Sequence, residues 1–330
     1  MTELQIGLLV IGALVVAGVF AYNRLQERGA QRDAERAFRS AHADALLGEE
    51  PRRREPQIEA ARAPVRAAAP AQATPDERID YVIELALARP LAAAAVREQW
   101  AALERRHARR ALLAESSEGT RWRAALQLVS RDGAVGEAEL IEFRAAVETL
   151  AAAAGATVSA PEMKAAVEAA REIDAFCADT DVQVVVHVVA PRGGSFPGTK
   201  IRAAAEAAGL ALEPDGRFAL RSDEGALVYA LAARDGTAFH AAAMREAAPG
   251  GLTLSLDVPR VPETRRAFES MMRLAQQLGA VLGGAIVDDA GNTLDERAVA
   301  AIAAQLQEVR GRLEGRGLAP GSPSALRLFS

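Results

Sequence analysis

The chain has 330 residues, a formal net charge of −5 and one cysteine, Cys177. Half of its residues are hydrophobic but only 4% are aromatic, so aliphatic side chains carry the apolar content. The net negative charge argues against a general nucleic-acid-binding protein, which usually shows a basic field. A single cysteine excludes an intramolecular disulfide framework and a cysteine-rich zinc site.

The first predicted element is a transmembrane helix over residues 6–23, preceded by a short extracytoplasmic tail at residues 1–5. The stretch 6–22 carries no charge and would be about 26 Å long as a helix, at ~1.5 Å per residue. Five arginines follow it between residues 24 and 39 and none precedes it. The positive-inside rule therefore predicts an external N-terminus and a cytoplasmic C-terminal bulk. A cleaved signal peptide, the alternative, would carry its basic residues before the apolar run.

Residues 24–77 are predicted to be a charged segment followed by a proline- and alanine-rich linker. The charged part either continues the membrane helix as a solvated stalk or frays. The linker shows no apolar period, so it cannot bury a core. Its composition is typical of a semi-extended spacer that lets a cytoplasmic module reach away from the bilayer.

Residues 78–180 form the upstream block of the predicted α+β region. Strands are expected at 79–86, 110–115 and 120–130, and helices at 90–105, at 137–152 and from residue 161 onward. The helix at 137–152 places Leu140, Phe143, Val147 and Leu150 at helical spacing. Pro161 stands at a first-turn position, where its missing N–H costs little.

Residues 181–316 repeat this order of elements, and a tail at 317–330 follows. Strands are expected at 182–189, 217–221, 227–233, 252–258 and 284–287, and helices at 199–208, 263–282 and 295–313. The order strand-helix-strand-strand-helix thus occurs twice. It predicts an internal duplication, or two related α+β halves.

The strand at 252–258 has the clearest pattern in the chain. Leucine and valine alternate there with threonine, serine and aspartate, which indicates a sheet with one buried and one open face. Helices should therefore cover one face only. The other face is either solvated or a docking surface.

The loop Gly193–Lys200 follows a predicted strand and precedes a helix, as a phosphate-binding loop does. A P-loop needs lysine directly before the hydroxyl residue, whereas Thr199 precedes Lys200 here. The exchange turns the two side chains by about 100° around the helix. A membrane-anchored nucleotide-binding enzyme that uses this loop and Asp288 is therefore the weakest functional hypothesis, and a tight loop that caps a helix is preferred.

Other candidate sites are weaker still. The four histidines show no paired spacing, so no metal site is predicted. Asp288 and Asp289 begin a run of turn-forming residues. Cys177 is expected to be a packed apolar residue. No nucleophile, base and orienting group come together, so the chain is not predicted to be an enzyme.

From about residue 182 to residue 310 the chain resembles the C-terminal domain of the ZipA cell-division family. The resemblance rests on four segments in the family's order and spacing. These are the glycine-strand-Val-Pro run Gly251–Pro259, the helix segment Phe268–Ala275, the Gly-Gly strand Leu282–Asp289 with its paired aspartates, and the last helix at Gln305–Arg310. The membrane helix and linker also agree with the family's layout.

The resemblance implies an α+β fold, with an antiparallel sheet whose helices pack on one face. It implies an adaptor that tethers FtsZ filaments to the bacterial inner membrane at the division septum. The C-terminal tail peptide of FtsZ would bind in a shallow apolar cleft on the open sheet face, and the N-terminal helix would enter the lipid bilayer. No cofactor, metal, nucleic acid or small-molecule substrate is implied. An envelope scaffold of similar fold with a different partner is the alternative.

The resemblance also implies which residues line the cleft. These are Gln183, Val185, Phe218, Ala230, Ala232, Arg234, Thr253 and Ser255. Phe218 stays ambiguous because Leu220 shares its face, and either side of that strand could be core. The family can place a large aromatic near the position of Ser255 and a methionine near that of Ala232, where this chain has small residues.

Overall fold

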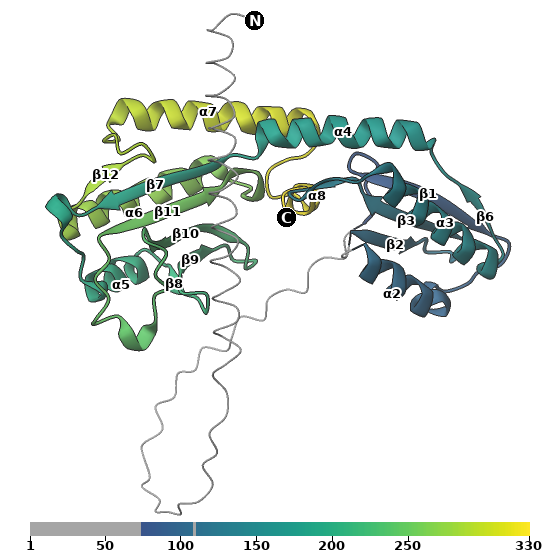
Figure 1. The fold of residues 1–330 in the computed structure, drawn as a ribbon, viewed down its shortest axis with the longest axis horizontal. Coiled ribbons are helices and arrows are strands. Elements are labelled where there is room, and N and C mark those ends of the chain that lie inside the picture. The colour runs from purple at the N-terminus through teal and green to yellow at the C-terminus, as the bar shows by residue number, and fades with distance from the viewer. Residues whose placement is uncertain (1–73, 108–109) are drawn as a thin grey trace, which may run out of the picture. The chain divides into compact units, whose positions relative to one another are not determined.

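The structure, a computed structural model, describes residues 74–107 and 110–330. The predicted transmembrane helix at 6–23 and most of the predicted linker lie outside the described residues. Within the described part of the chain, no helix combines the length and the apolar character of a membrane span. The described chain contains two α+β halves, here called the upstream half (residues 80–180) and the downstream half (residues 183–315), and a short C-terminal segment (Figure 1).

The upstream half contains a four-stranded antiparallel sheet in the order β2-β3-β1-β6. Its strands are β1 (Asp80–Leu87), β2 (Ala111–Glu115), β3 (Arg121–Gln127) and β6 (Ala156–Ser159), and a small hairpin joins β4 (Val129–Ser130) to β5 (Gly133–Ala134). Its helices are α2 (Arg97–Arg106), α3 (Glu137–Ala154) and α4 (Met163–Thr180). The sequence patterns predicted most of these elements but missed β6. The helix predicted from Pro90 becomes α-helical only at Arg97, after a short 3-10 turn.

The downstream half contains a six-stranded antiparallel sheet in the order β12-β7-β11-β10-β9-β8. Its strands are β7 (Gln183–Val189), β8 (Ala211–Leu212), β9 (Phe218–Arg221), β10 (Leu227–Ala233), β11 (Gly251–Asp257) and β12 (Ala285–Val287). Its helices are α5 (Gly198–Ala207), α6 (Thr264–Leu282) and α7 (Glu296–Gly315). The C-terminal segment adds α8 (Pro323–Leu328), which the sequence analysis left as an unassigned tail.

The two halves have the same topology. Read from matching edges, their sheets run β2-β3-β1-β6 and β10-β11-β7-β12, and the downstream half adds β9 and β8 beyond β10. In both halves a glycine of positive φ ends the helix that precedes the last strand: Gly155 at 66° after α3, and Gly283 at 70° after α6. Glycine adopts this left-handed conformation without a Cβ penalty. The predicted repetition is therefore real at the level of strand order.

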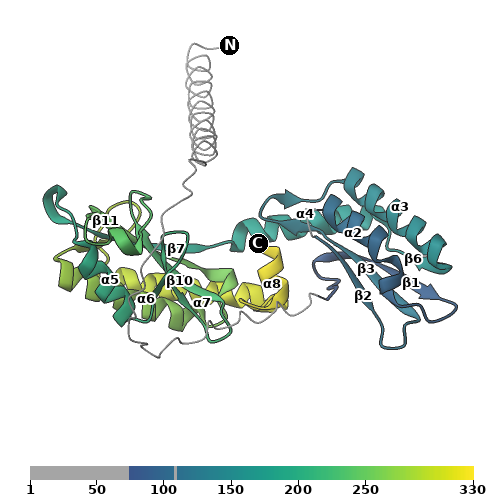
Figure 2. The same ribbon diagram turned by 90° about the horizontal axis from the view of Figure 1, so that it is seen from below.

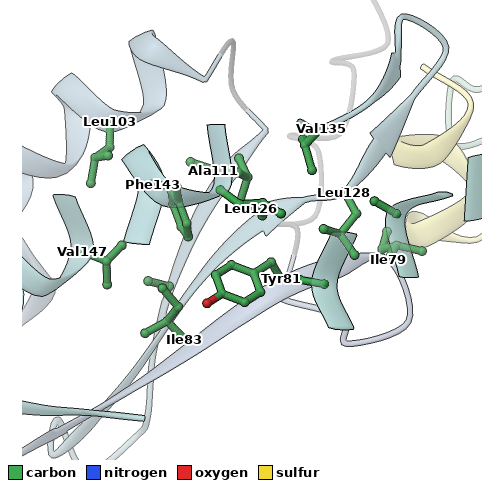
Figure 3. Close-up of a cluster of buried hydrophobic side chains, with 14 of the residues drawn as sticks. Ile79, Tyr81, Ile83, Leu103, Ala111, Leu126, Leu128, Val135, Phe143 and Val147 are labelled. Carbon is green, nitrogen blue, oxygen red and sulfur yellow. The ribbon is translucent and has the colours of Figure 1, made fainter. Parts of the chain in front are cut away.

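The upstream core lies between its sheet and helices α2 and α3. Tyr81, Ile83 and Leu126 of the sheet pack with Phe143 and Val147 of α3, all at most 2% exposed (Figure 3). Figure 2 shows α2 and α3 on the same side of β1 and β3. The same cluster includes three residues of the C-terminal segment: Ala325, Leu328 and Phe329.

The downstream core follows the alternation predicted from the sequence. Leu252, Leu254 and Leu256 are fully buried, and their neighbours on β7 are buried as well. Side chains of α5, α6 and α7 belong to the same cluster. Burial of each leucine is worth about 1.5–3 kcal/mol, so the register of β11 is firmly set. The intervening residues Thr253, Ser255 and Asp257 lie on the other face.

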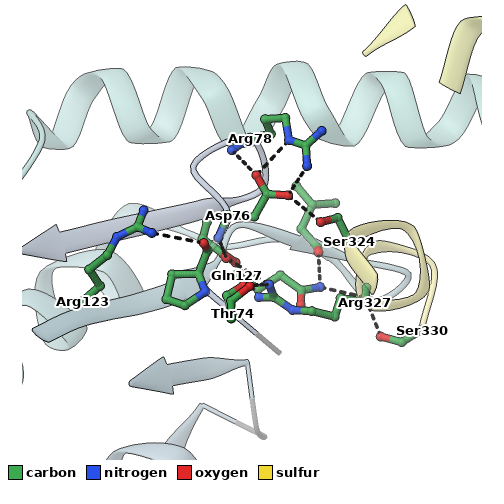
Figure 4. A network of polar contacts seen from close by, with 11 residues as sticks. Thr74, Asp76, Arg78, Arg123, Gln127, Ser324, Arg327 and Ser330 are labelled. Carbon is green, nitrogen blue, oxygen red and sulfur yellow. Dashed lines mark hydrogen bonds and ion pairs between the residues drawn. The ribbon is translucent and has the colours of Figure 1, made fainter. Parts of the chain in front are cut away.

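The C-terminal segment is held to the upstream half by a polar network (Figure 4). The guanidinium of Arg327 donates to both carboxylate oxygens of Asp80, at 2.5 and 3.0 Å, and the side-chain amide of Gln127 donates to the carbonyl of Arg327 at 2.9 Å. Ser324 donates its hydroxyl to Asp76 at 2.5 Å. Burial raises the pKa of Asp80, and the neighbouring Arg327 opposes that shift. The tail is therefore part of the fold.

Candidate functional site

The candidate site is the face of the downstream sheet that is opposite its helices, here called the downstream open face. Helices α5, α6 and α7 all contribute to the core cluster on the other face. Strand pairing arranges the open-face residues in cross-strand rows. Ala230, Ser255 and Val185 form one row, and Ala232 and Thr253 form the next together with His187.

Seven of the eight predicted residues lie on or beside this face. Six of them come from the paired strands: Gln183, Val185, Ala230, Ala232, Thr253 and Ser255. Most are half-buried, and Gln183 is exposed. The floor of the face is made of small side chains, so a partner's backbone or larger apolar side chains can approach the sheet closely.

Arg234, the seventh residue, lies at one end of the face. Its backbone N–H donates to the carbonyl of Gly251 at 3.0 Å. A Cβ placed on Gly251 would lie 3.3 Å from the Cβ of Arg234 and 3.2 Å from its Cδ, so the arginine side chain passes over this glycine. Arg234 is exposed, and its guanidinium forms no hydrogen bond or ion pair with the residues that the structure describes. A cation is thus available to an acidic group of a ligand.

Phe218 was expected on the open face, and the structure corrects this expectation. Phe218 is opposite Leu231 in the sheet, and both residues are fully buried in the helix-covered core. Its ring centroid lies 5.6 Å from that of Phe239. The ambiguity between the two sides of β9 is resolved in favour of the core because the large ring finds apolar partners there.

Two residues near the centre of the face were not assigned to it by the sequence analysis. The imidazole of His187 lies within hydrogen-bonding distance of the Thr253 hydroxyl, 2.9 Å from Nδ1, and of an Asp289 carboxylate oxygen, 2.8 Å from Nε2. His187 is 8% exposed, whereas the side chain of Asp289 is 75% exposed. The alternation of β7 could have placed His187 beside Val185. The contact with Asp289, 102 residues away, depends on the fold.

The opposite end of the face carries an ion-pair cluster. Arg131 donates to the carboxylate of Asp181 at 2.6 and 2.9 Å and to that of Asp257 at 3.0 Å. Burial raises the pKa of Asp257, and the Arg131 guanidinium acts in the opposite direction. Because this arginine already has two carboxylate partners, Arg234 is the better candidate to meet an anionic ligand.

A groove of about 510 Å³ extends the face along the edge of β7. Strand β12 pairs only with residues 187–189 of β7, so the preceding part of β7 has no strand neighbour on that side. The groove lies between this part of β7 and α7. The residues lining it include Val182, Gln183, Val185, Ile302, Leu306 and Val309. It adds apolar surface next to the small side chains of the open face.

The hypothesis of a nucleotide-binding loop finds no geometry to support it. In the loop Gly193–Lys200, the N–H groups of Phe196 and Gly198 donate to the carbonyls of Pro249 and Ala247, at 2.9 and 2.8 Å. These donors are therefore not free to hold a phosphate. Asp288 accepts the backbone N–H of Asn292 at 2.7 Å, as expected for a turn.

The described residues offer no other reactive centre of the kinds considered. No group of three or more histidine, cysteine, aspartate or glutamate side chains that could hold a metal occurs among them. Burial raises the pKa of the Cys177 thiol to about 12, which leaves it protonated and unreactive at neutral pH. Cys177 packs against the upstream core, as predicted.

Residues 182–305 match the family model described as the ZipA C-terminal FtsZ-binding domain. No curated protein matches the chain. The matched range begins just before β7 and ends within α7, so it includes the whole downstream sheet and its open face. This match implies an FtsZ-binding role in cell division. The members of the matched family are adaptors rather than enzymes. The downstream half is therefore similar to the ZipA C-terminal FtsZ-binding domain over residues 182–305.

Proposed function

We propose that this protein tethers FtsZ filaments to the cytoplasmic membrane by binding the C-terminal tail peptide of FtsZ on the downstream open face. The observation that carries the proposal is the match to the FtsZ-binding family over the half whose sheet has one face free of helices. We keep residues 181–316 as the proposed bounds of the FtsZ-binding domain and residues 78–180 as those of the upstream block.

Two features of the face support peptide binding. Its floor of alanine, serine and threonine admits bulky side chains of a ligand, so most of the buried apolar area would come from the peptide and from the groove beside β7. Arg234 supplies a cation without a partner among the described residues. An amphipathic peptide with an acidic group near one end of its apolar side chains suits this arrangement.

The membrane part of the proposal rests on residues 6–23. We propose that this segment is an uncleaved single-pass anchor, with the N-terminus outside and the FtsZ-binding half in the cytoplasm, at the division septum. Alkaline carbonate washing of membranes should leave the full chain in the pellet, whereas a variant lacking residues 6–23 should be released. Release of the full chain by the same washing would overturn the anchor.

Peptide titration tests the binding site. The full chain in detergent should bind a fluorescent FtsZ tail peptide. The Ser255→Glu substitution should weaken this binding at least tenfold, because it places a bulky charge in the middle row of the face. Ala203→Glu on the exposed surface of α5 adds the same charge away from the face and should change the affinity less than twofold. Thermal unfolding of both variants checks that the fold is retained.

Two results would contradict the proposal. If the full chain binds no FtsZ tail peptide even at millimolar concentration, the alternative of an envelope scaffold with a different partner gains support. If Ser255→Glu and Ala203→Glu weaken binding equally, the peptide binds elsewhere on the molecule.

A further inference from the structure

The upstream half also has a sheet face opposite α2 and α3, which we call the upstream open face. Asp80 is opposite Gln127 in the upstream sheet, just as Gln183 is opposite Asp257 in the downstream sheet. These matching cross-strand pairs give each residue row of the upstream face a corresponding row on the downstream face. The upstream row of Leu112, Ala125 and Val82 corresponds to the downstream row of Ala230, Ser255 and Val185. Val82 and Ala125 are buried, so only the part of the upstream face beyond this row is accessible.

One end of the upstream open face is closed by the chain itself. Pro75 is buried, and Arg123 donates to the Pro75 carbonyl at 3.5 Å and to Glu77 at 2.8 Å. Arg327 binds Asp80 at the same end. The far end is open and contains a cavity of about 540 Å³. The residues lining this cavity include Glu84, Ala86, Ala114, Arg121, Arg123 and Thr157.

An arginine occupies the same position on both faces, although it comes from different strands. In the downstream half the side chain of Arg234 passes over Gly251, which has no side chain of its own. The upstream position that corresponds to Gly251 holds Arg121, directly opposite Ala86. Arg121 is exposed, and its guanidinium forms no hydrogen bond or ion pair with the described residues. An anionic group that pairs with one of these arginines can therefore pair with the other.

We propose that the upstream open face is a second binding site for the same FtsZ tail segment, so that one chain binds two tails. This inference rests on the proposed function. The occupant is chosen by charge and register: small side chains, here Ala86, Ala114 and Thr157, lie beside one free guanidinium on the upstream face as they do on the downstream face. Glu84 lies two residues from Ala86 on β1, so the acidic group of the ligand pairs with Arg121 at the other end of the cavity.

Binding stoichiometry tests this inference on the full chain in detergent. Calorimetric titration with the FtsZ tail peptide should give two peptides per chain. Ser255→Glu should remove the downstream site and leave one peptide per chain. The pair Ala114→Glu and Arg121→Glu should remove the upstream site and also leave one. All three substitutions together should abolish binding. Ala145→Glu, on the exposed surface of α3, is the matched upstream control and should leave two.

Site-specific photocrosslinking provides a readout that does not depend on a damaging substitution. A photoreactive phenylalanine analogue at Ala86 should crosslink to the peptide, and the same analogue at the exposed Ile141 of α3 should not. The second site would be overturned if the parent chain binds one peptide, if Ser255→Glu abolishes that binding, and if Ala114→Glu with Arg121→Glu leaves it unchanged. This outcome would leave the proposed function intact. No binding to the parent chain would instead overturn the proposed function and, with it, this inference.

Discussion

The two halves share a topology but differ in how they complete their cores. Every buried residue of the downstream cluster lies between Val184 and Leu306, within that half. The upstream cluster combines residues 79–173 with Leu313, Leu318, Leu328 and Phe329. Two halves with the same strand order therefore differ in whether each completes its core with its own residues. A repeated fold can keep one copy self-contained while the other depends on a distant segment of the chain.

The largest expected effect is that of removing residues 318–330. The deletion exposes apolar surface that Leu318, Leu328 and Phe329 cover, each worth about 1.5–3 kcal/mol, and it leaves Asp80 buried without its partner. The loss approaches the ~5–15 kcal/mol stability of a typical domain.

Hydrogen exchange followed by mass spectrometry should show fast exchange across the upstream half and native protection in β7 and β11. Leu306→Ala should lower protection in the downstream half instead. Equal loss in both halves after the deletion would refute the asymmetry.

Removing only the buried ion pair should have the next largest effect. Arg327→Ala leaves the Asp80 carboxylate uncompensated in a site where its side chain is fully buried, which costs about 3–5 kcal/mol. Arg310→Ala removes an arginine that pairs with Glu314 on the surface of α7 and should cost at most about 0.5 kcal/mol. Urea denaturation measures both.

A second substitution sharpens that measurement. Asp80→Asn in the Arg327→Ala background removes the stranded charge and should restore part of the lost free energy of unfolding. Equal costs for Arg327→Ala and Arg310→Ala would show that the tail is held by its apolar contacts alone.

A smaller effect is expected where the two halves differ by one methyl group. Gly284 occupies the position that Ala156 has in the upstream half, directly after the glycine that ends the preceding helix. A Cβ at Gly284 would lie 2.8 Å from the Phe196 ring and 2.9 Å from a Val188 methyl. Gly284→Ala should therefore destabilise the protein by about 1–3 kcal/mol.

Gly311→Ala is the matched control for that substitution. A Cβ at Gly311, within α7, meets nothing within 4 Å, and alanine is favoured over glycine in a helix by about 1 kcal/mol. Thermal unfolding should show a lower midpoint for Gly284→Ala and a higher one for Gly311→Ala. A neutral Gly284→Ala would show that Phe196 can move at no cost.

The smallest expected effect is a pH dependence confined to the upstream half. Hydrogen bonds from Arg78 and Ser324 lower the pKa of Asp76 from 3.8 to about 2. Because the folded-state pKa is depressed, the stabilisation is fully present above about pH 4 and is lost as the pH falls toward about 2. Asp76→Asn should cost roughly 1.5 kcal/mol at neutral pH, and its difference from the parent chain should shrink over that range. A constant difference would exclude Asp76 as the titrating group.

The sequence predicted much of the fold because its patterns are local. The alternation in β11 and the apolar spacing of α3 each depend on residues within one element. The strand β6 and the helix α8 were missed because four or six residues are too few for a periodic pattern. The side of Phe218 depends on its pairing with Leu231 and its ring contact with Phe239, and no pattern within β9 encodes these partners.

The candidate site was predictable to a similar extent and for the same reason. The alternation within β11 alone places Thr253 and Ser255 on the open face. The alternation within β7 would have placed His187 there in the same way. The contact of His187 with Asp289 and the path of Arg234 over Gly251 join residues from different elements. The upstream open face could not be recognised from the sequence because its correspondence to the downstream face depends on which residues pair across strands, and no pattern within one strand encodes this pairing.

The position of Phe329 in the upstream core has a consequence for folding during synthesis. Domains are generally completed in the order in which they leave the ribosome. Here the half that is made first cannot close its core until Leu328 and Phe329 have emerged, since both residues belong to that core. The downstream half, made later, has all its core residues available earlier. The nascent chain should therefore complete its second half before its first.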